Sequence, residues 1–391
     1  MDIVAFIKEK LFNKAVTLPA GVYHYASPPD VEKPYRYHLR LEPSGVGIMI
    51  INASTVLHLN RTAAEYAYHL INSHSPDETL QAMASRYNIP TEIIKEDFKH
   101  FTENLVDLLE TPDLDPVTFF DLERTTPYGK HSTAPYRLDC ALTYRLVHGL
   151  DEAVSPLDRV NRELSSSEWK TILSKAWDAG IPHVFFTGGE PTLRPDLADL
   201  IEHAELLGMV TGIVTDGQRL ANTGYIHSLL QKGLDHVIIT LDPYDSESLE
   251  ALKDTLSEDI HVTVHLTITK ENIGKIEEFL PRIASLGAKS VSFSAANESL
   301  MPQLLTAQQK ANDLELAMVW DIPVPYSRFN PISMELKANQ QYEDGAATAW
   351  LYIEPDGDVL PSQGIIEKLG NFLLDPWSTI WDNAEKFHNA N

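Results

Sequence analysis

Cysteine is nearly absent from this chain. The 391 residues include one, Cys140. A disulfide framework is therefore excluded, and cysteines of this chain cannot build a zinc or iron–sulfur site by themselves. Long apolar runs are also missing, because no stretch approaches the roughly 18 residues needed to span a bilayer. The start of the chain, MDIVAFIKEKLFNKAV, is too short and too charged for a secretory signal, so we expect a cytosolic protein.

Basic residues are scarce as well. Lys and Arg total 31 against 56 Asp and Glu, and the formal net charge is −25. Such a surface repels a phosphate backbone or an anionic membrane, so we expect neither nucleic acid nor membrane as a partner. The acidity also serves solubility. A hydrophobic content of 43% is typical of globular proteins, and the length favours two or three domains.

The first third of the sequence predicts a β-hairpin followed by three helices. Residues 46–59 contain two β-rich runs interrupted at 52–54, and Asn60 is placed to cap the helix that follows. The apolar spacing predicts helices over 62–71, 77–87 and 91–110. This is a winged-helix-like α+β unit. It is acidic and has no basic stripe, which favours a peptide over DNA as its ligand.

The rest of the chain predicts a parallel sheet with helices outside it. Residues 111–136 hold four prolines and lack helical periodicity, as in a linker. Strand-like and helix-like segments then alternate from Arg137 to Ser294, which indicates a partial (β/α)6 barrel with functional residues at the carboxyl ends of its strands. Beyond Pro302 we expect a helix over 306–319 and a hairpin that turns at Asp356 and Gly357.

The segment HVFFTGGEPTLRPDLADLI contains two adjacent glycines between a predicted strand and a predicted helix. Glycines at such a place let a ligand approach the backbone closely, because no Cβ stands in the way. They also suit a tight βα loop without a ligand, and on the pattern alone we favour that interpretation.

In its context this segment resembles the GGEP motif of radical S-adenosylmethionine (SAM) enzymes, whose loop contacts the methionyl amino group. Similar elements follow in order: LDCALTYR (138–145) as first strand, Thr215 to Gly217 as the TNG element, and IITLDP (238–243) as the fourth-strand element. The resemblance implies SAM contacts at Thr187, Gly188, Gly189, Glu190, Thr215, Asp216, Gly217, Thr240 and Asp242. Asp216 stands where the family usually has asparagine, which exchanges a donor for a charged acceptor.

Both ends of the chain extend the resemblance. IEPDGDVLPS (353–362), Gly370 with Asn371, and TIWDN (379–383) are similar to the SPASM extension of peptide-modifying, PqqE-like members. The N-terminal unit resembles the PqqD-like domain that recognises leader peptides, the RiPP recognition element. In that family an extended peptide adds a strand to the hairpin sheet and packs against the third helix. The implied peptide surface consists of Val46, Ile48, Ile50, Val56, Ile93, Phe98 and Phe101.

The cluster motif of the family is missing. Where CxxxCxxC is expected, the residues are Leu146, Leu150 and Ala153, and the expected Pro-Cys of the extension is Pro361 followed by Ser362. YEDGAATAW (342–350) lacks cysteine too. Iron–sulfur clusters are held by thiolates, and neither leucine nor alanine has a lone pair to offer. His148 and Asp151 cannot replace three thiolates. Cys140 lies on a predicted strand as a small buried hydrophobe. We expect neither a cluster nor any other metal.

These observations favour a catalytically inactive radical SAM homologue, a pseudoenzyme. It would bind a precursor or leader peptide, or a partner enzyme, during biosynthesis of a ribosomally synthesised, post-translationally modified peptide (RiPP). One alternative is an enzyme using the barrel mouth for non-radical chemistry, with S-adenosylmethionine as a candidate ligand. Glu190, Asp216, Asp242 and His265 could then face one cavity, although their spacing specifies no proton transfer. Another alternative is a structural subunit of a complex with an active radical SAM enzyme.

We expect the chain to divide into a peptide-recognition domain (1–115), a linker (116–136), the barrel (137–302) and the C-terminal extension (303–391).

Overall fold

The computed structural model describes residues 18–28, 31, 35–52, 55–87, 89–111, 132–335 and 345–390. The chain divides into two compact units, residues 1–133 and 134–391. The start of the chain, most of the predicted linker and residues 342–344 of the cysteine-free segment lie outside the described residues. No helix of the described part is long and apolar enough to cross a membrane.

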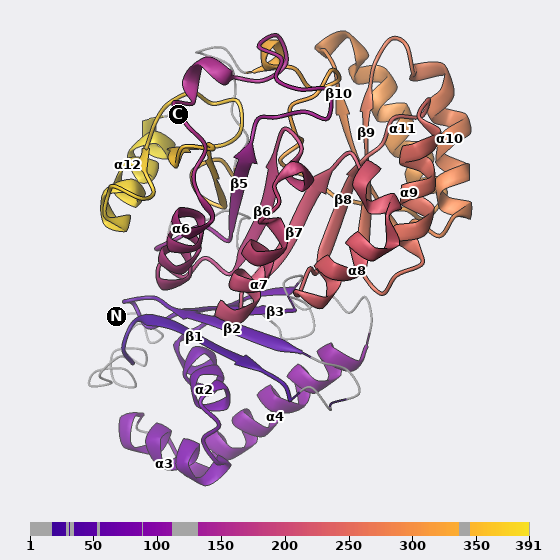
Figure 1. The fold of residues 1–391 in the computed structure, drawn as a ribbon. Helices are drawn as coiled ribbons and strands as arrows, with labels where there is room; N and C mark the ends of the chain where they lie inside the picture. The colour runs from indigo at the N-terminus through magenta and orange to yellow at the C-terminus, as the bar shows by residue number, and fades with distance from the viewer. Residues whose placement is uncertain are drawn as a thin grey trace. The chain divides into compact units, whose positions relative to one another are not determined.

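The N-terminal unit combines an antiparallel sheet with three helices (Figure 1). The strands, in the order β1-β2-β3-β4, are Gly21–Ala26, Arg36–Leu41, Gly47–Ile51 and Thr55–Leu59. The helices are α2 (Arg61–Ile71), α3 (Pro76–Arg86) and α4 (Thr91–Glu110). The predicted helices are confirmed, and Asn60 caps α2 by accepting from the backbone N–H of Ala63 at 3.0 Å. The hairpin alone was an incomplete prediction, because β1 and β2 extend the sheet.

One face of this sheet packs on the helices. Alternate strand residues, among them Leu39, Met49 and Leu57, are fully buried in that core. Phe98 and Phe101 of α4 join the same core, with ring centroids 5.4 and 5.9 Å from the Tyr66 ring. The N-terminal unit therefore has a hydrophobic core of its own.

The C-terminal unit is built on one sheet in the order β11-β10-β9-β8-β7-β6-β5-β12-β13-β14. Its central six strands are parallel neighbours, as the partial barrel requires. They are β5 (Arg137–Thr143), β6 (His183–Gly188), β7 (Val210–Thr215), β8 (His236–Thr240), β9 (His261–Ile268) and β10 (Ser290–Ala295). The predicted α/β partial barrel is confirmed.

Helices follow these strands and form an outer layer (Figure 1). They are α6 (Ser166–Asp178), α7 (Leu197–Leu207), α8 (Thr223–Gln231), α9 (Ser246–Leu256), α10 (Ile273–Ser285) and α11 (Met301–Asp313). On β5, Leu138, Cys140 and Leu142 are buried in the same core as Trp169 and Leu173 of α6. Because side chains alternate along a strand, Asp139, Ala141 and Thr143 take the opposite, inner face.

The extension adds short strands and a last helix. These are β11 (Ala317–Met318), β12 (Trp350–Ile353), β13 (Asp358–Leu360), β14 (Gly370–Asn371) and α12 (Trp377–Ala390). β12 and β13 pair antiparallel, and Gly357 turns between them with φ of 91°, which confirms the predicted hairpin. The helix predicted over 306–319 instead begins at Met301 and ends at Asp313. Glu315, with φ of 58°, reverses the chain there, and β11 then joins β10.

Candidate functional site

A cavity of about 610 Å³ opens at the carboxyl ends of the barrel strands. Five residues of the predicted SAM contacts line it: Gly189, Glu190, Asp216, Thr240 and Asp242. Leu146, Leu150 and His265 line the same cavity. The structure therefore brings the GGEP-like loop together with two of the three positions at which the resemblance leads us to expect cluster cysteines. Of the remaining predicted contacts, the hydroxyl of buried Thr187 donates to the Pro323 carbonyl at 2.8 Å, and Gly188, Thr215 and Gly217 lie beside the lining residues.

The two glycines of the GGEP loop lie against backbone of their own chain. A Cβ at Gly188 would lie 2.2 Å from the Thr143 carbonyl oxygen, and one at Gly189 would lie 2.4 Å from that of Arg145. The N–H of Gly189 donates to the Thr143 carbonyl at 2.7 Å, and the N–H of Glu190 donates to that of Arg145 at 2.8 Å. This close approach of the β6 loop to the end of β5 explains the glycines without any ligand.

Gly188→Ala is accordingly expected to destabilise the C-terminal unit by about 2 kcal/mol or more, because it combines a backbone clash with a φ of 125°. Gly274→Ala is the matched control, since nothing lies within 4 Å of a Cβ there. Urea denaturation of both variants measures the difference. Equal stabilities would show that the loop relaxes around the new methyl group.

Glu190 joins the loops that follow β6 and β7. Its Oε1 accepts from the N–H and hydroxyl of Thr192 (3.0 and 2.5 Å) and from the hydroxyl of Thr215 (2.7 Å). Its Oε2 accepts from the N–H of Asp216 at 2.8 Å. The side chain is 3% exposed, and burial together with the charge of Asp216 raises its pKa to about 7, against the effect of these hydrogen bonds. Glu190 therefore stabilises the cavity wall, and both of its carboxylate oxygens accept hydrogen bonds from groups of the protein.

Asp216 and Asp242, two further carboxylates of this cavity, have different hydrogen-bond partners from those of Glu190. Asp216 accepts from the N–H of Gln218 at 2.9 Å, and burial, with the nearby charge of Asp245, raises its pKa. Asp242 accepts from the N–H of Tyr244 at 3.0 Å and forms an ion pair with Arg328. In the described part of the chain, Asp242 is thus paired with a cation, whereas Glu190 and Asp216 accept hydrogen bonds from backbone N–H groups and hydroxyls.

His265 lies on β9 and is 1% exposed. Burial lowers its pKa to about 3, so the imidazole is neutral at physiological pH. Its Nε2 lies 3.2 Å from the hydroxyl of Thr267 and 3.1 Å from that of Ser294. A neutral imidazole beside carboxylates can exchange hydrogen bonds with a ligand but holds no charge of its own.

The loop after β5 does not fit an iron–sulfur cluster. Leu146 and Gly149 exchange backbone hydrogen bonds of 3.1 and 2.9 Å, and the N–H of Ala153 donates to the Asp151 carboxylate at 2.9 Å. Ala153 is exposed and does not line the cavity. Within the described residues, no group of three or more His, Cys, Asp or Glu could hold a metal ion. Cys140 is buried in the core shared with the helices, on the other face of β5.

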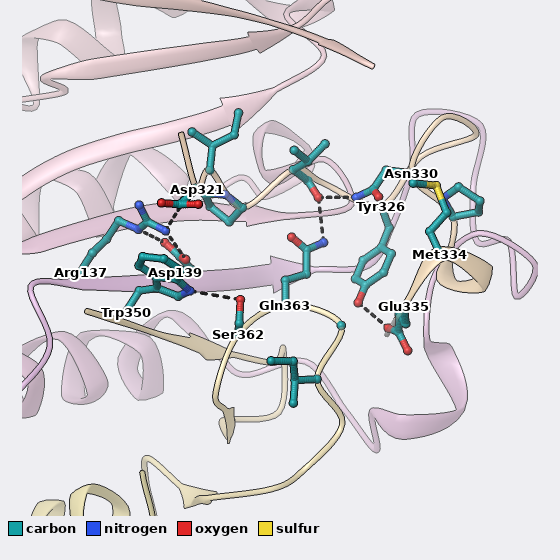
Figure 2. A pocket seen from close by; sticks show the side chains of 16 residues that line it. Arg137, Asp139, Asp321, Tyr326, Asn330, Met334, Glu335, Trp350, Ser362 and Gln363 are labelled. Atoms are coloured by element: carbon teal, nitrogen blue, oxygen red, sulfur yellow. Dashed lines mark hydrogen bonds and ion pairs between the residues drawn. The ribbon is translucent and has the colours of Figure 1, made fainter. Parts of the chain in front are cut away.

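The extension lines a second cavity of about 270 Å³ with Ser362 at its wall (Figure 2). The Ser362 hydroxyl accepts from the indole N–H of Trp350 at 3.1 Å. Nearby, Arg137 forms a bidentate pair with Asp139 at 2.7 and 3.0 Å, and also donates to the Asp321 carbonyl at 2.6 Å. The polar side chains here form hydrogen bonds with one another. Ser362, at the position where the resemblance leads us to expect cysteine, accepts a hydrogen bond and offers no thiolate.

A buried ionic network borders this second cavity, and the sequence analysis misses it. Arg159 forms a bidentate pair with Glu335 at 2.7 and 2.8 Å, and its Nε donates to Glu354 at 3.0 Å. The hydroxyl of Tyr326 donates to Glu335 at 2.6 Å, and that of Tyr144 donates to Glu354 at 3.1 Å. The partners are far apart along the chain, so no local pattern could have revealed them.

The residues implied for peptide recognition lie in different environments. Ile48 and Ile50 are 6% exposed, on the sheet face opposite the helices. Val46 and Ile93 are exposed, at 36% and 48%, and Val56 is half-buried. Phe98 and Phe101 are 7% exposed in the helical core, so they support the sheet and present little surface. β4, which contains Val56, forms one edge of the described sheet.

Known proteins resemble this chain in sequence. Residues 140–293 match the family model of the radical SAM superfamily. The PqqA peptide cyclase of Streptomyces rochei is 27% identical over 286 residues, covering 65% of this chain and 78% of that protein. The PqqA peptide cyclase of Rhizobium meliloti is 27% identical over 283 residues, covering 65% and 75%. The residues matched by the family model include the cavity lining from Leu146 to Thr267.

Solved structures resemble it in fold. Streptococcus suis SuiB bound to S-adenosylmethionine superposes with a TM-score of 0.59 at 18% identity, covering 92% of this chain and 89% of that one. SuiB bound to its precursor peptide SuiA gives 0.56 at 16% identity, covering 93% and 88%. The likeness spans the N-terminal α+β domain, the barrel and the extension. Residues 140–293 are thus similar to the radical SAM superfamily, and the chain has the fold of SuiB, with an N-terminal α+β domain, a partial α/β barrel and a C-terminal extension.

Proposed function

We propose that this chain is a radical SAM homologue without radical chemistry, which binds a precursor or leader peptide, or a partner enzyme, in RiPP biosynthesis. The donor set is the observation that supports this most strongly. Leu146, Leu150 and Ala153 stand at the cluster positions, and the single cysteine, Cys140, is buried toward the helices. Without a cluster the reaction has no electron source, since that chemistry belongs to the cofactor. The barrel keeps its shape because helix and strand packing stabilise it.

The proposed division assigns peptide recognition to residues 1–115, with a linker over 116–136, the barrel over 137–302 and the extension over 303–391. The likeness to SuiB with its precursor peptide supports a peptide as ligand. The edge strand β4 and the exposed Ile93 are the groups that a peptide strand would contact.

Anaerobic reconstitution with iron and sulfide tests the loss of chemistry. We expect no stoichiometric iron or sulfide in the purified chain, because the loop after β5 has no thiolate donors. Cys140→Ala is the control, since iron that persists in this variant is not bound by a thiolate. Stoichiometric iron and sulfide with the absorption of a [4Fe–4S] cluster would overturn the proposal.

Calorimetric titration of short peptides encoded beside this gene tests recognition. We expect micromolar binding, about −8 kcal/mol. Ile93→Glu should weaken it tenfold or more by placing a charge on the contact surface. Val106→Glu is the matched control, because Val106 is 49% exposed on the same helix, roughly 3.6 turns further on and near the opposite side. If none of the peptides binds the wild-type chain, peptide recognition is wrong.

The second candidate, a non-radical enzyme, rests on Glu190, Asp216 and His265 lying in one cavity with shifted pKa values. S-adenosylmethionine is its candidate ligand, and a calorimetric titration measures its affinity. The Gly188 carbonyl accepts from the N–H of Tyr326 at 2.8 Å, and no iron would chelate the methionyl group, so we expect weak binding at most. A structural subunit, the third candidate, would co-purify with an active homologue.

A further inference from the structure

Residues 327–330 form a short closed loop at the mouth of the barrel. The N–H of Ser327 donates to the Asn330 carbonyl at 3.1 Å, and the N–H of Asn330 donates to the Ser327 carbonyl at 3.0 Å. The side-chain amide of Asn330 also donates to the Val324 carbonyl at 2.7 Å (Figure 2). Because these bonds lie within one segment of the chain, the loop can move without breaking them.

The chain is anchored on both sides of this loop. Before it, the N–H of Tyr326 donates to the Gly188 carbonyl at 2.8 Å, and the Tyr326 hydroxyl donates to Glu335 at 2.6 Å. After it, the N–H of Ile332 donates to the Val154 carbonyl at 2.8 Å. Movement is therefore restricted to the loop between two fixed points.

The loop forms a wall between two cavities. Arg328 and Phe329 line the barrel-mouth cavity of about 610 Å³, and the same two residues line a neighbouring cavity of about 640 Å³. Tyr244 and residues 269–272, which follow β8 and β9, line the neighbouring cavity as well. Displacement of the loop would therefore widen the entrance of the barrel-mouth cavity.

One ion pair holds the loop across this entrance. Arg328 pairs with Asp242, which follows β8. In the described part of the chain, no other ion pair or hydrogen bond joins residues 327–330 to a residue outside 321–335. The Arg328 side chain is 69% exposed and that of Asp242 is 14% exposed. Ion pairs with an exposed partner are weak and are screened by salt.

The charge of the cavity favours the closed position of the loop. Arg328 is the one arginine or lysine among the lining residues. Six carboxylates line the same cavity, namely those of Asp151, Glu190, Asp216, Asp242, Asp245 and Glu247. Walls that carry one sign of charge attract a group of the opposite sign. The acidic lining therefore attracts the guanidinium group of the loop itself.

We propose that residues 327–330 are a lid over the barrel-mouth cavity, which the attraction between Arg328 and the acidic lining holds closed and which salt releases. The lid controls access to the cavity whichever ligand enters it, so this inference does not depend on the proposed function.

Thiol labelling of the full chain measures how readily the lid opens. Cys140→Ala removes the native thiol, and Thr267→Cys then places a thiol in the barrel-mouth cavity, where the native side chain is 7% exposed. N-ethylmaleimide is an uncharged reagent, so salt does not change its attraction to the cavity. We expect slow labelling at low ionic strength. Arg328→Met, or sodium chloride at about 0.5 M, should accelerate it about threefold or more.

Thr306→Cys is the matched control, because Thr306 is exposed on α11 and does not line the cavity. Its labelling should not respond to Arg328→Met. Arg328→Lys keeps the charge and should leave Thr267→Cys slow. Loss of a nearby cation makes a thiolate harder to form, so that effect cannot account for faster labelling. If Thr267→Cys does not fold, Thr240→Cys places the thiol in the same cavity.

Three results would overturn the proposal. Thr267→Cys that is labelled as fast as Thr306→Cys at low salt would show that the cavity has no lid. Equal labelling of Thr267→Cys with and without Arg328→Met would show that this arginine does not hold the lid closed. A salt effect that persists in full after Arg328→Met would assign it to another charge. No peptide takes part in this test, so its result is independent of the Ile93 test.

Discussion

Replacing Arg159 with methionine is expected to destabilise the C-terminal unit by about 3 kcal/mol or more. Arg159 is the only cation within hydrogen-bond distance of Glu335 and Glu354 in the described part of the chain, and these side chains are 13% and 4% exposed. Burial raises the pKa of Glu354, which shows the cost of its charge there. Without the guanidinium, two carboxylates stay buried beside each other and beside tyrosine hydroxyls. Urea denaturation measures the loss.

Arg162→Met is the control for this prediction. Arg162 pairs with Glu168 at 2.6 and 2.9 Å, but the pair lies at the surface, where water and salt screen it. We expect little change in stability. If both variants lose the same stability, the network around Arg159 has no special role in joining the extension to the barrel.

Much of the fold could be predicted because the barrel strands are short apolar runs between clear helices. Residues 183–188 and 236–240 are examples. β2 was missed because His38 and Arg40 interrupt its apolar residues, and both are buried in the folded chain. The end of α11 was missed because Glu315 adopts a left-handed φ without the glycine that usually marks it. Tertiary contacts therefore determine the strand β2 and the end of α11, and local sequence patterns do not reveal them.

The candidate site was predictable in place but not in detail. The motif located Gly189, Glu190 and Asp216 at one strand edge, and the cavity brings them together. The sequence did not reveal that the glycines touch their own backbone. The contact of His265 with Ser294 depends on the neighbouring strand β10, and such pairings across strands leave no trace in a single sequence.

We expect the stability of the folded chain to decrease as the pH rises, because Glu190 is a buried carboxyl with a raised pKa. Its pKa rises to about 7 in the folded chain, while the unfolded chain has the usual value of 4.5. The folded state therefore holds this proton more tightly, so its stabilising contribution is complete below about pH 4.5 and is lost as the pH rises through 7. The difference corresponds to about 3 kcal/mol at 1.36 kcal/mol for each pKa unit. Asp216, which also titrates nearby, adds a change of the same sign.

Glu190→Gln cannot titrate, so its stability should fall less between pH 5 and pH 8 than that of the wild-type chain. Urea denaturation at both pH values measures this. The baseline is expected to drop as well, because the new amide group directs N–H donors at a site where the Thr192, Thr215 and Asp216 donors already converge. Glu247→Gln, an exposed carboxyl of the same cavity, should keep the wild-type profile. Identical profiles in the wild-type chain and Glu190→Gln would mean that the converging donors keep Glu190 ionised throughout, and that hydrogen bonding outweighs burial at this wall of the cavity.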